Sequence, residues 1–218
     1  FVEKDGGEYV VFFDPLDGSA NTEVNVTVGT VFSIYHIDTN LLQPGNKQVA
    51  AGYILYGTSC MFVYSSGNGV NGFTLDPSIG TFLLSHPNMT IPKEGNLYSI
   101  NEANSAQYDK PTKNYLEAIK QQGSYKARYI GSMVADIHRT LILGGIFLYP
   151  ADHKYKDGKL RLMFEVNPMA YLIKQAGGIA LSGTRDPLDL IPSSLHQRAP
   201  IVLGSKKNVE EYLSFTKS

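Results

Sequence analysis

The 218-residue chain has little of several features that would point directly to a class of protein. Its single cysteine, Cys60, excludes an internal disulfide framework and favours a reducing, cytoplasmic compartment. With 19 basic and 20 acidic residues the net charge is −1, so the charge balance indicates neither a nucleic-acid nor a membrane partner. No apolar run approaches the roughly 18 residues that a membrane span requires. What remains is a globular protein whose 43% hydrophobic residues can build a core.

The pattern of apolar residues changes along the chain. Short β-branched and aromatic runs, separated by Gly, Asn or Pro, predict strands at 9–13, 24–35, 49–56, 61–64, 70–75 and 81–84. The second half predicts helices at 112–122, 133–143, 163–175 and 206–215, alternating with strands at 146–149, 179–181 and 201–203. Ser132 is expected to cap the second of these helices with its side chain.

This pattern predicts an α/β protein of the α+β layered kind, in which a mixed or antiparallel sheet is followed by an α/β layered region. We divide it into a sheet-rich half, residues 1–100, and an α/β half, residues 101–218. The seam is expected within residues 101–110, where neither pattern holds.

Residues 14 to 19 read Asp-Pro-Leu-Asp-Gly-Ser and directly follow the apolar run 9–13. Two carboxylates, Asp14 and Asp17, set by a rigid turn at the end of a strand, can hold hard divalent cations such as Mg²⁺. Gly18 and Ser19 offer small side chains and open backbone N–H groups, which suit a phosphate oxygen. The alternative is a β-turn in which the two acids accept only from their own backbone. The full hexapeptide after a strand favours the first interpretation, a metal site beside a phosphate site, as a metal-assisted phosphatase needs.

The hexapeptide resembles the signature of the Mg²⁺-dependent, Li⁺-sensitive sugar phosphatases. Later stretches resemble class I fructose-1,6-bisphosphatase in order and spacing, and the resemblance runs from about Tyr9 to Leu213. These stretches are Gly29-Thr30-Val31-Phe32, Val49-Ala50-Ala51-Gly52-Tyr53, Gly131-Ser132-Met133-Val134-Ala135-Asp136, residues 144–150, Lys159-Leu160-Arg161-Leu162 and Asn167-Pro168-Met169-Ala170-Tyr171. Because Phe1 is not a methionine and a strand begins almost at once, we expect an N-terminal part of roughly a hundred family residues to be missing. That part would hold further acidic ligands, the general base and any targeting segment.

The resemblance implies a metal site with catalytic acids. Asp14, Asp17, Glu165 and the carbonyl of Leu16 would share two or three Mg²⁺ ions, with Mn²⁺ or Zn²⁺ as alternatives. Glu165 is assigned by its place ahead of a helix that ends in Ala-Gly-Gly, here residues 176–178. From the sequence alone, Glu165 is equally well a first-turn acid favoured by the helix dipole.

The resemblance also implies a set of substrate contacts. The residues are Gly18, Ser19, Asn101, Arg128, Tyr129, Gly131, Ser132, Met133, Tyr149 and Lys159. In the family the arginine reaches into a neighbouring subunit, so a homo-oligomer, a tetramer by analogy, is expected. Asn104 departs from the family's tyrosine, which would weaken or replace one hydrogen bond to the 6-phosphate. The resemblance assigns Lys159 to the substrate and leaves Arg161, two residues further along the chain, for an internal ion pair.

The implied activity is hydrolysis of the 1-phosphate of fructose 1,6-bisphosphate to fructose 6-phosphate and phosphate by Mg²⁺-activated water, as in gluconeogenesis. A sedoheptulose-1,7-bisphosphatase is the alternative substrate assignment. A non-catalytic sugar-phosphate-binding subunit without its catalytic head is the alternative from another class. Family members inhibited by AMP use a lysine and an arginine where this chain has Glu8 and His36, which predicts weak inhibition by AMP.

Overall fold

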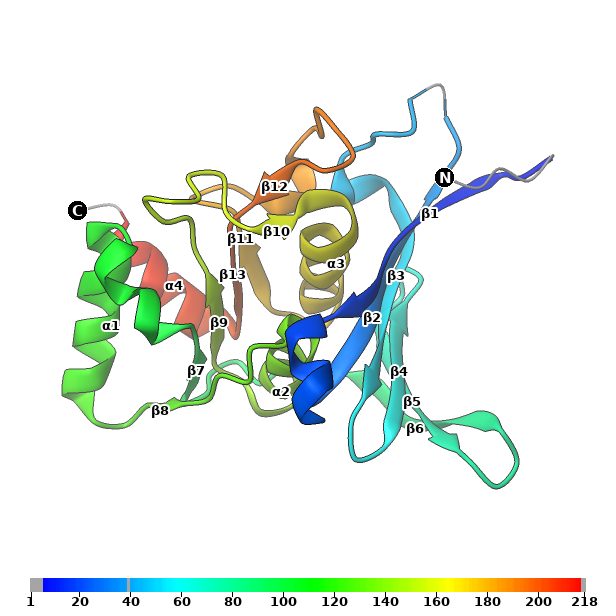
Figure 1. Cartoon of the computed structure of the whole chain (residues 1–218), viewed down its shortest axis with the longest axis horizontal. Coiled ribbons are helices and arrows are strands. Elements are labelled where there is room, and N and C mark those ends of the chain that lie inside the picture. Colours follow the sequence, from blue (N-terminus) through cyan, green and yellow to red (C-terminus); the bar gives the residue numbers. More distant parts are fainter. Residues whose placement is uncertain (1–5, 39, 217–218) are drawn as a thin grey trace.

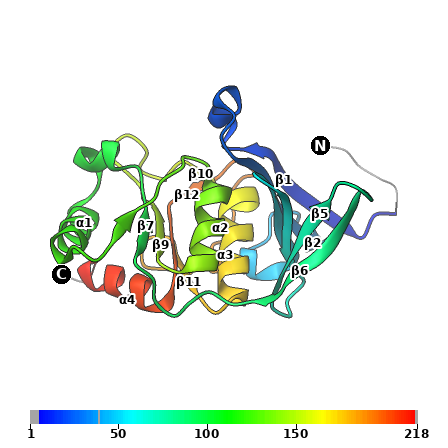
Figure 2. The same cartoon turned by 90° about the horizontal axis from the view of Figure 1, so that it is seen from below.

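Four layers of secondary structure make up the computed structural model, which describes residues 6–38 and 40–216 (Figure 1). A six-stranded sheet packs on the helices α2 (Met133–Leu143) and α3 (Asn167–Gln175). A second sheet covers the other side of this pair, and α1 (Lys110–Gln122) and α4 (Lys206–Phe215) lie on its far face. The view turned by 90° shows the same order of layers (Figure 2). The predicted fold class, α/β with an antiparallel sheet before a layered region, is confirmed.

The first sheet is antiparallel throughout, and its strands follow one another in sequence order. They are β1 (Tyr9–Asp17), β2 (Val28–His36), β3 (Gln48–Tyr56), β4 (Cys60–Ser65), β5 (Val70–Asp76) and β6 (Thr81–Met89). The prediction of a strand at 24–35 is wrong at its start, because residues 19–24 form a 3₁₀ helix, η1 (Ser19–Val24). Gly18 and Asn25, both in the left-handed region, flank this helix, and β2 begins only after it.

The second sheet is mixed, with strand order β11–β13–β9–β7–β8. The alternation of strands and helices predicted the strands β11 (Ile179–Leu181), β13 (Ile201–Gly204) and β9 (Ile146–Tyr149), which the structure joins in antiparallel pairs. Two strands that pair in parallel with their neighbours, β7 (Leu97–Ser99) and β8 (Lys126–Ala127), were not predicted because such short runs carry no periodicity. A separate two-stranded ladder joins β10 (Leu160–Arg161) to β12 (Arg198–Ala199).

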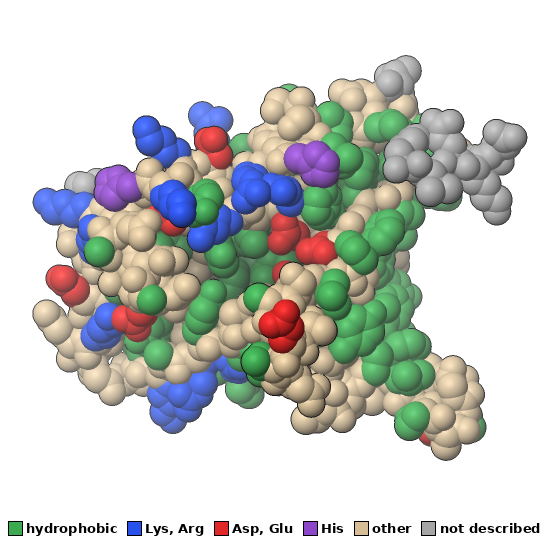
Figure 3. All heavy atoms as spheres, viewed as in Figure 1, with side chains coloured by type: hydrophobic (Ala, Val, Ile, Leu, Met, Phe, Trp, Pro, Cys, Tyr) green, Lys and Arg blue, Asp and Glu red, His purple; other side chains and the backbone are tan. Residues whose placement is uncertain are grey.

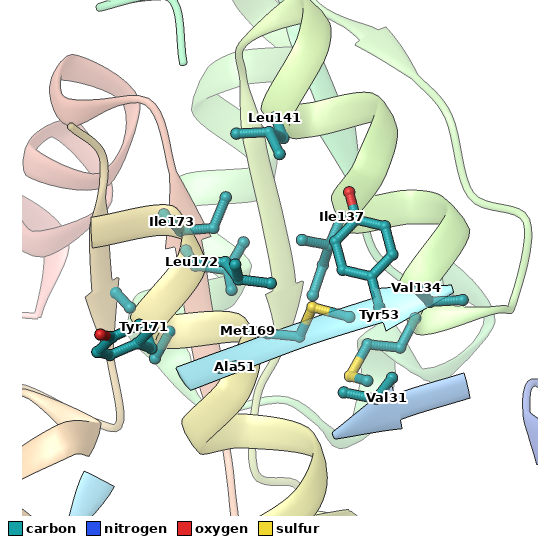
Figure 4. Packing of buried hydrophobic residues seen from close by; sticks show 14 of the residues in the cluster. Val31, Ala51, Tyr53, Val134, Ile137, Leu141, Met169, Tyr171, Leu172 and Ile173 are labelled. Atoms are coloured by element: carbon teal, nitrogen blue, oxygen red, sulfur yellow. The ribbon is translucent and has the colours of Figure 1, made fainter. Parts of the chain in front are cut away.

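The main core lies between the two sheets, around α2 and α3. Figure 4 shows Ile137 and Leu141 of α2 facing Met169 and Leu172 of α3 above the strands β2 and β3. All four side chains are almost fully buried. None of the helices in the described part of the chain has the length and apolar character needed to cross a membrane.

The helix predicted at 163–175 is divided into two parts. Residues Leu162–Val166 form a π-helical turn, η4, and α3 begins only at Asn167. Single π turns inside helices are rare and are often found at functional sites. This turn carries Glu165.

The face of the first sheet that is turned away from α2 and α3 carries an aromatic cluster of its own. Phe62 lies at its centre, with ring centroids of Phe32, Tyr64, Phe73 and Phe82 at 5.2–6.1 Å. These rings belong to none of the buried core clusters. The apolar surface of this sheet is therefore partly open to solvent on one side.

Candidate active site

The two acids of the hexapeptide are brought to one face of β1 by an irregularity in its pairing. Asp14 lies opposite Val31 and Asp17 opposite Gly29, so three steps on β1 match two steps on β2. In a regular strand, residues three apart point to opposite faces, and the extra residue of a bulge restores the same face. Asp14 is half-buried and Asp17 is buried with 5% of its surface exposed.

The turn between these acids also has the geometry of the alternative interpretation, a β-turn in which an acid accepts from its own backbone. The Leu16 N–H donates to Asp14 Oδ1 at 3.0 Å, as in an Asx turn. The Thr30 hydroxyl donates to the Pro15 carbonyl at 2.9 Å and ties the turn to β2. Only one carboxylate oxygen of Asp14 is used in this way, so the turn and a metal site are compatible.

Asp17 sits at the N-terminus of α2. Its Oδ2 accepts from the Val134 N–H at 2.9 Å and from the Ser132 hydroxyl at 3.3 Å. The prediction that the Ser132 side chain caps its own helix is wrong, because this hydroxyl is turned to Asp17 and makes no cap bond. The carboxylate from the other half of the chain therefore takes the place of the cap, where the helix dipole favours a negative group.

Glu165 completes the cluster from the π turn η4. Its Oε2 accepts from the Arg161 N–H at 2.6 Å. One ligand atom each of Asp14, Asp17 and Glu165 lies within 4.8 Å of the others. The structure thus brings Glu165 to two aspartates that lie about 150 positions earlier in the chain.

Burial raises the pKa values of two of these acids. The pKa of Asp17 is raised to about 6 by burial and by the nearby charge of Asp14, although the Val134 amide opposes the shift. The pKa of Glu165 is raised to about 7 by burial and by the two aspartates, against the Arg161 amide. Across residues 6–38 and 40–216, no basic side chain forms an ion pair with any of the three. A donor set made only of oxygen, short of positive charge, fits hard divalent cations.

A hollow of about 170 Å³ opens beside this cluster. Its lining consists of Asp17, Gly18, Tyr129, Gly131, Met133, Asp136, Phe147, Tyr149 and Leu160. Figure 3 shows acidic side chains beside an apolar hollow, with Lys and Arg side chains gathered above it. Five of the predicted substrate residues line this space: Gly18, Tyr129, Gly131, Met133 and Tyr149.

Asp136 is a residue of this hollow that the sequence analysis missed. Its carboxylate is almost fully buried and accepts from the N–H groups of Ile130 and Gly131 at 3.0–3.1 Å. It thereby fixes the loop that leads into α2. The sequence signal was an acid in the first turn of a helix after a glycine, which is too common to single out.

A narrower cleft lies on the other side of Tyr149, which lines both spaces. Asn101, Asn104 and Lys159 line the cleft with Tyr149, whereas Tyr129 lines only the hollow. The Lys159 ammonium lies 4.3 Å from the centre of the Tyr155 ring, which restricts its position. Tyr108, also missed from the sequence, donates its hydroxyl to the Asn101 carbonyl at 2.7 Å.

Three predicted substrate residues do not line these spaces. Ser19 is exposed at the start of η1, and Ser132 is buried against Asp17. Arg128 is exposed and donates to its own neighbour, the Ala127 carbonyl, at 2.8 Å. Among the described residues Arg161 forms no ion pair, and it is its backbone N–H that contacts Glu165.

Comparison with known proteins gives a consistent result along the whole chain. Residues 1–87 match the family model described as "Fructose-1-6-bisphosphatase, N-terminal domain", and residues 91–217 match "Fructose-1-6-bisphosphatase, C-terminal domain". A "Fructose-1,6-bisphosphatase class 1" of Sulfurihydrogenibium is 56% identical over 99% of this chain and 68% of its own length. A "Fructose-1,6-bisphosphatase, cytosolic" of Brassica napus is 55% identical over 97% of this chain and 66% of its own length.

Solved structures agree. The holo form of Leishmania major fructose-1,6-bisphosphatase superimposes with a TM-score of 0.96 and 42% identity, over 100% of this chain and 72% of the Leishmania chain. The T-state structure of the same enzyme gives the same TM-score with 41% identity, over 100% of this chain and 73% of that one. The chain spans between 63% and 68% of the length of the curated relatives that it matches.

Proposed function

The chain belongs to the class I fructose-1,6-bisphosphatase family, and on this basis we propose that its protein hydrolyses the 1-phosphate of fructose 1,6-bisphosphate. The products are fructose 6-phosphate and phosphate. The observation that carries the proposal is the cluster of Asp14, Asp17 and Glu165 at the edge of a hollow that continues toward Lys159. Relatives from Brassica napus and Arabidopsis thaliana bear the name cytosolic, which supports a cytoplasmic place in gluconeogenesis.

The metal proposed for this site is Mg²⁺, two or three ions held by the three carboxylates and the carbonyl of Leu16. When bound, the cations neutralise phosphoryl oxygens and lower the pKa of a coordinated water, which makes it a nucleophile at neutral pH. The part played by the chain is to hold its carboxylates in place. Asp17 is fixed by the α2 amide of Val134, and Glu165 by the amide of Arg161.

The substrate is proposed to lie along the hollow and the cleft. Backbone N–H groups of Gly18, Ser19, Ser132 and Met133, on the two segments that meet at Asp17, would donate to the 1-phosphate and sugar oxygens. Gly131, whose own N–H is held by Asp136, would line the substrate's path without donating to it. The 6-phosphate would meet Asn101, Tyr129, Tyr149 and Lys159, with Arg128 supplied by a second subunit. Positive charge at one end of the groove and carboxylates at the other favour a single orientation of a sugar bisphosphate.

The test removes one carboxylate from the intact natural protein. Asp17→Ala is expected to abolish hydrolysis and to weaken Mg²⁺ binding sharply, because a neutral water cannot replace the charge of a ligand. Asp76→Ala is the matched control, since Asp76 ends β5 at an exposed turn and accepts from the Ser78 N–H at 2.9 Å. Activity of Asp17→Ala within about tenfold of the parent at saturating Mg²⁺ would contradict the assignment.

A further inference from the structure

The position of Glu165 relative to the two aspartates depends on how η4 packs against the first sheet. Asp14 and Asp17 belong to β1, whereas Glu165 belongs to the π turn η4, so their separation is set by whatever joins η4 to the sheet. At that junction the Ser33 hydroxyl of β2 donates to the Met163 carbonyl of η4 at 2.7 Å. Both residues have no exposed surface.

We infer that Ser33 is a positioning residue for the proposed metal site: its hydroxyl fixes the π turn so that Glu165 meets Asp14 and Asp17. The inference rests on the proposed function only in taking these acids as metal ligands. Ser33 itself touches none of them.

The register of the strands shows how short the link is. Ser33 pairs with Phe12, and Asp14 is two residues further along β1, opposite Val31. On the other side of the contact, Glu165 follows Met163 by two residues. Glu165 is therefore two residues from one end of this buried hydrogen bond, and Asp14 is two residues from Phe12, the pairing partner of its other end. A shift of the bond would be passed to the distance between these two acids.

The sequence of the turn explains why it needs an outside donor. In an α-helix the Met163 carbonyl would accept from the N–H of Asn167, but that N–H bonds to Leu162 across the π turn. The next N–H along the chain would belong to Pro168, which has none. A buried carbonyl without a partner is costly, and the Ser33 hydroxyl fills this place.

A second contact holds the other end of the turn. The Asn167 side-chain amide donates to the Tyr35 hydroxyl at 3.1 Å, and the Gln48 side chain donates to the Asn167 carbonyl at 3.1 Å. Tyr35 follows Ser33 by two residues on the same buried face of β2. A small buried cluster, separate from the main core, contains Val10, Tyr35 and Met163. The hydrogen bonds that hold the turn are therefore local to this cluster.

The experiment compares Ser33→Ala with Ser205→Ala in the intact natural protein. Ser205 is also fully buried, and its hydroxyl donates to a backbone carbonyl, that of Pro92, at 2.6 Å, outside the lining of the proposed site. Both variants lose a buried hydrogen bond from a serine to a backbone carbonyl, and Ser205→Ala also removes the acceptor of the Gly145 N–H, so both are expected to lower the thermal unfolding midpoint. Only Ser33→Ala is expected to weaken Mn²⁺ binding, measured by calorimetry on metal-free protein, by about threefold to tenfold. KM for the bisphosphate at saturating metal should be unchanged.

A second variant keeps the inference testable if Ser33→Ala does not fold. Tyr35→Phe keeps the ring in its cluster and removes the hydroxyl that accepts from the Asn167 amide, and it should weaken Mn²⁺ binding in the same direction. Lowered unfolding midpoints with unchanged Mn²⁺ affinity would overturn the positioning role while leaving the proposed function intact. A parent protein that binds no Mn²⁺ would overturn both.

Discussion

At the scale of single residues, the buried acids of the site destabilise the folded chain when they are ionised. Burial and mutual repulsion raise the pKa of Asp17 to about 6 and that of Glu165 to about 7 in the metal-free chain. A carboxyl whose pKa is raised on folding binds a proton more tightly in the folded state. Its contribution to stability is fully present below its unfolded pKa and is lost as the pH rises through the folded value.

This gives a prediction for the protein in a chelator. Its unfolding midpoint should fall as the pH rises from about 4 through 7, because the two acids ionise. Adding a divalent metal at pH 8 should raise the midpoint again. Asp17→Asn keeps an acceptor for Val134 and removes the charge, so it should stabilise the metal-free protein at pH 8 relative to the parent. The expected size is about 3 kcal/mol, since one pKa unit corresponds to about 1.4 kcal/mol. Chemical denaturation of both proteins at pH 5 and pH 8 measures this difference in unfolding free energy. Equal pH profiles would show that the charge of Asp17 does not destabilise the fold.

A second prediction at this scale concerns inhibition by AMP. The ring of Tyr9 lies 5.0 Å from that of His36, and the Glu8 carbonyl accepts from Ile37 at 2.8 Å, so Glu8 and His36 meet at one end of the β1–β2 pair. An anion at position 8 repels a phosphate, and a charge-assisted hydrogen bond is worth about 1.5–3 kcal/mol. We expect AMP inhibition to be weak and the double variant Glu8→Lys, His36→Arg to strengthen it by orders of magnitude. Half-inhibition of the parent at low micromolar AMP would refute this.

At the scale of elements, the junction of β1 with α2 has no room for a side chain. Gly18 has φ +77, and a Cβ built there would lie 2.7 Å from the Cβ of Ser132. Gly80 is the matched control, because it has φ +66 with nothing within 4 Å. Gly80→Ala should cost about 1 kcal/mol of unfolding free energy from backbone strain. Gly18→Ala should cost about 1–3 kcal/mol more and weaken metal binding, because Asp17 is pushed from the Val134 amide. Equal losses of unfolding free energy at the two positions would show that the junction of β1 with α2 can shift to accept a side chain.

The same elements show what the sequence could predict. The bounds of α2 followed from the flanking Ser132 and Gly144, and those of α4 from its amphipathic pattern. The π turn could not be predicted, because its residues share the periodicity of the helix that follows and only contact with β2 selects the wider turn. Glu165 was assigned by resemblance alone, and Asp136 was missed because its role depends on the loop folding back over it. Long-range pairings of this kind leave no local signal.

At the scale of the molecule, the site is assembled at the boundary between the first sheet and the layered region. Asp14 and Asp17 come from one side and Glu165 from the other, and the two family models meet between residues 87 and 91. The division at 100 and 101 made from the sequence stays a prediction. A site shared across such a boundary is sensitive to how the layers pack, which explains why a buried hydrogen bond between them, such as that of Ser33, matters to it.

The last prediction is about assembly. Arg128 is exposed at the end of β8, lines neither the hollow nor the cleft of its own chain, and is proposed to enter the cleft of a neighbouring copy. Arg128→Ala should raise KM about tenfold or more, because a charge-assisted contact to the 6-phosphate is lost. Mixing this variant with Asp17→Ala should restore part of the affinity in hybrid oligomers, where an intact metal site receives Arg128 from its neighbour. Light scattering should give a dimer or larger assembly, a tetramer by resemblance. A monomer at micromolar concentration, or a mixture no better than the sum of its parts, would place Arg128 outside the neighbour's site.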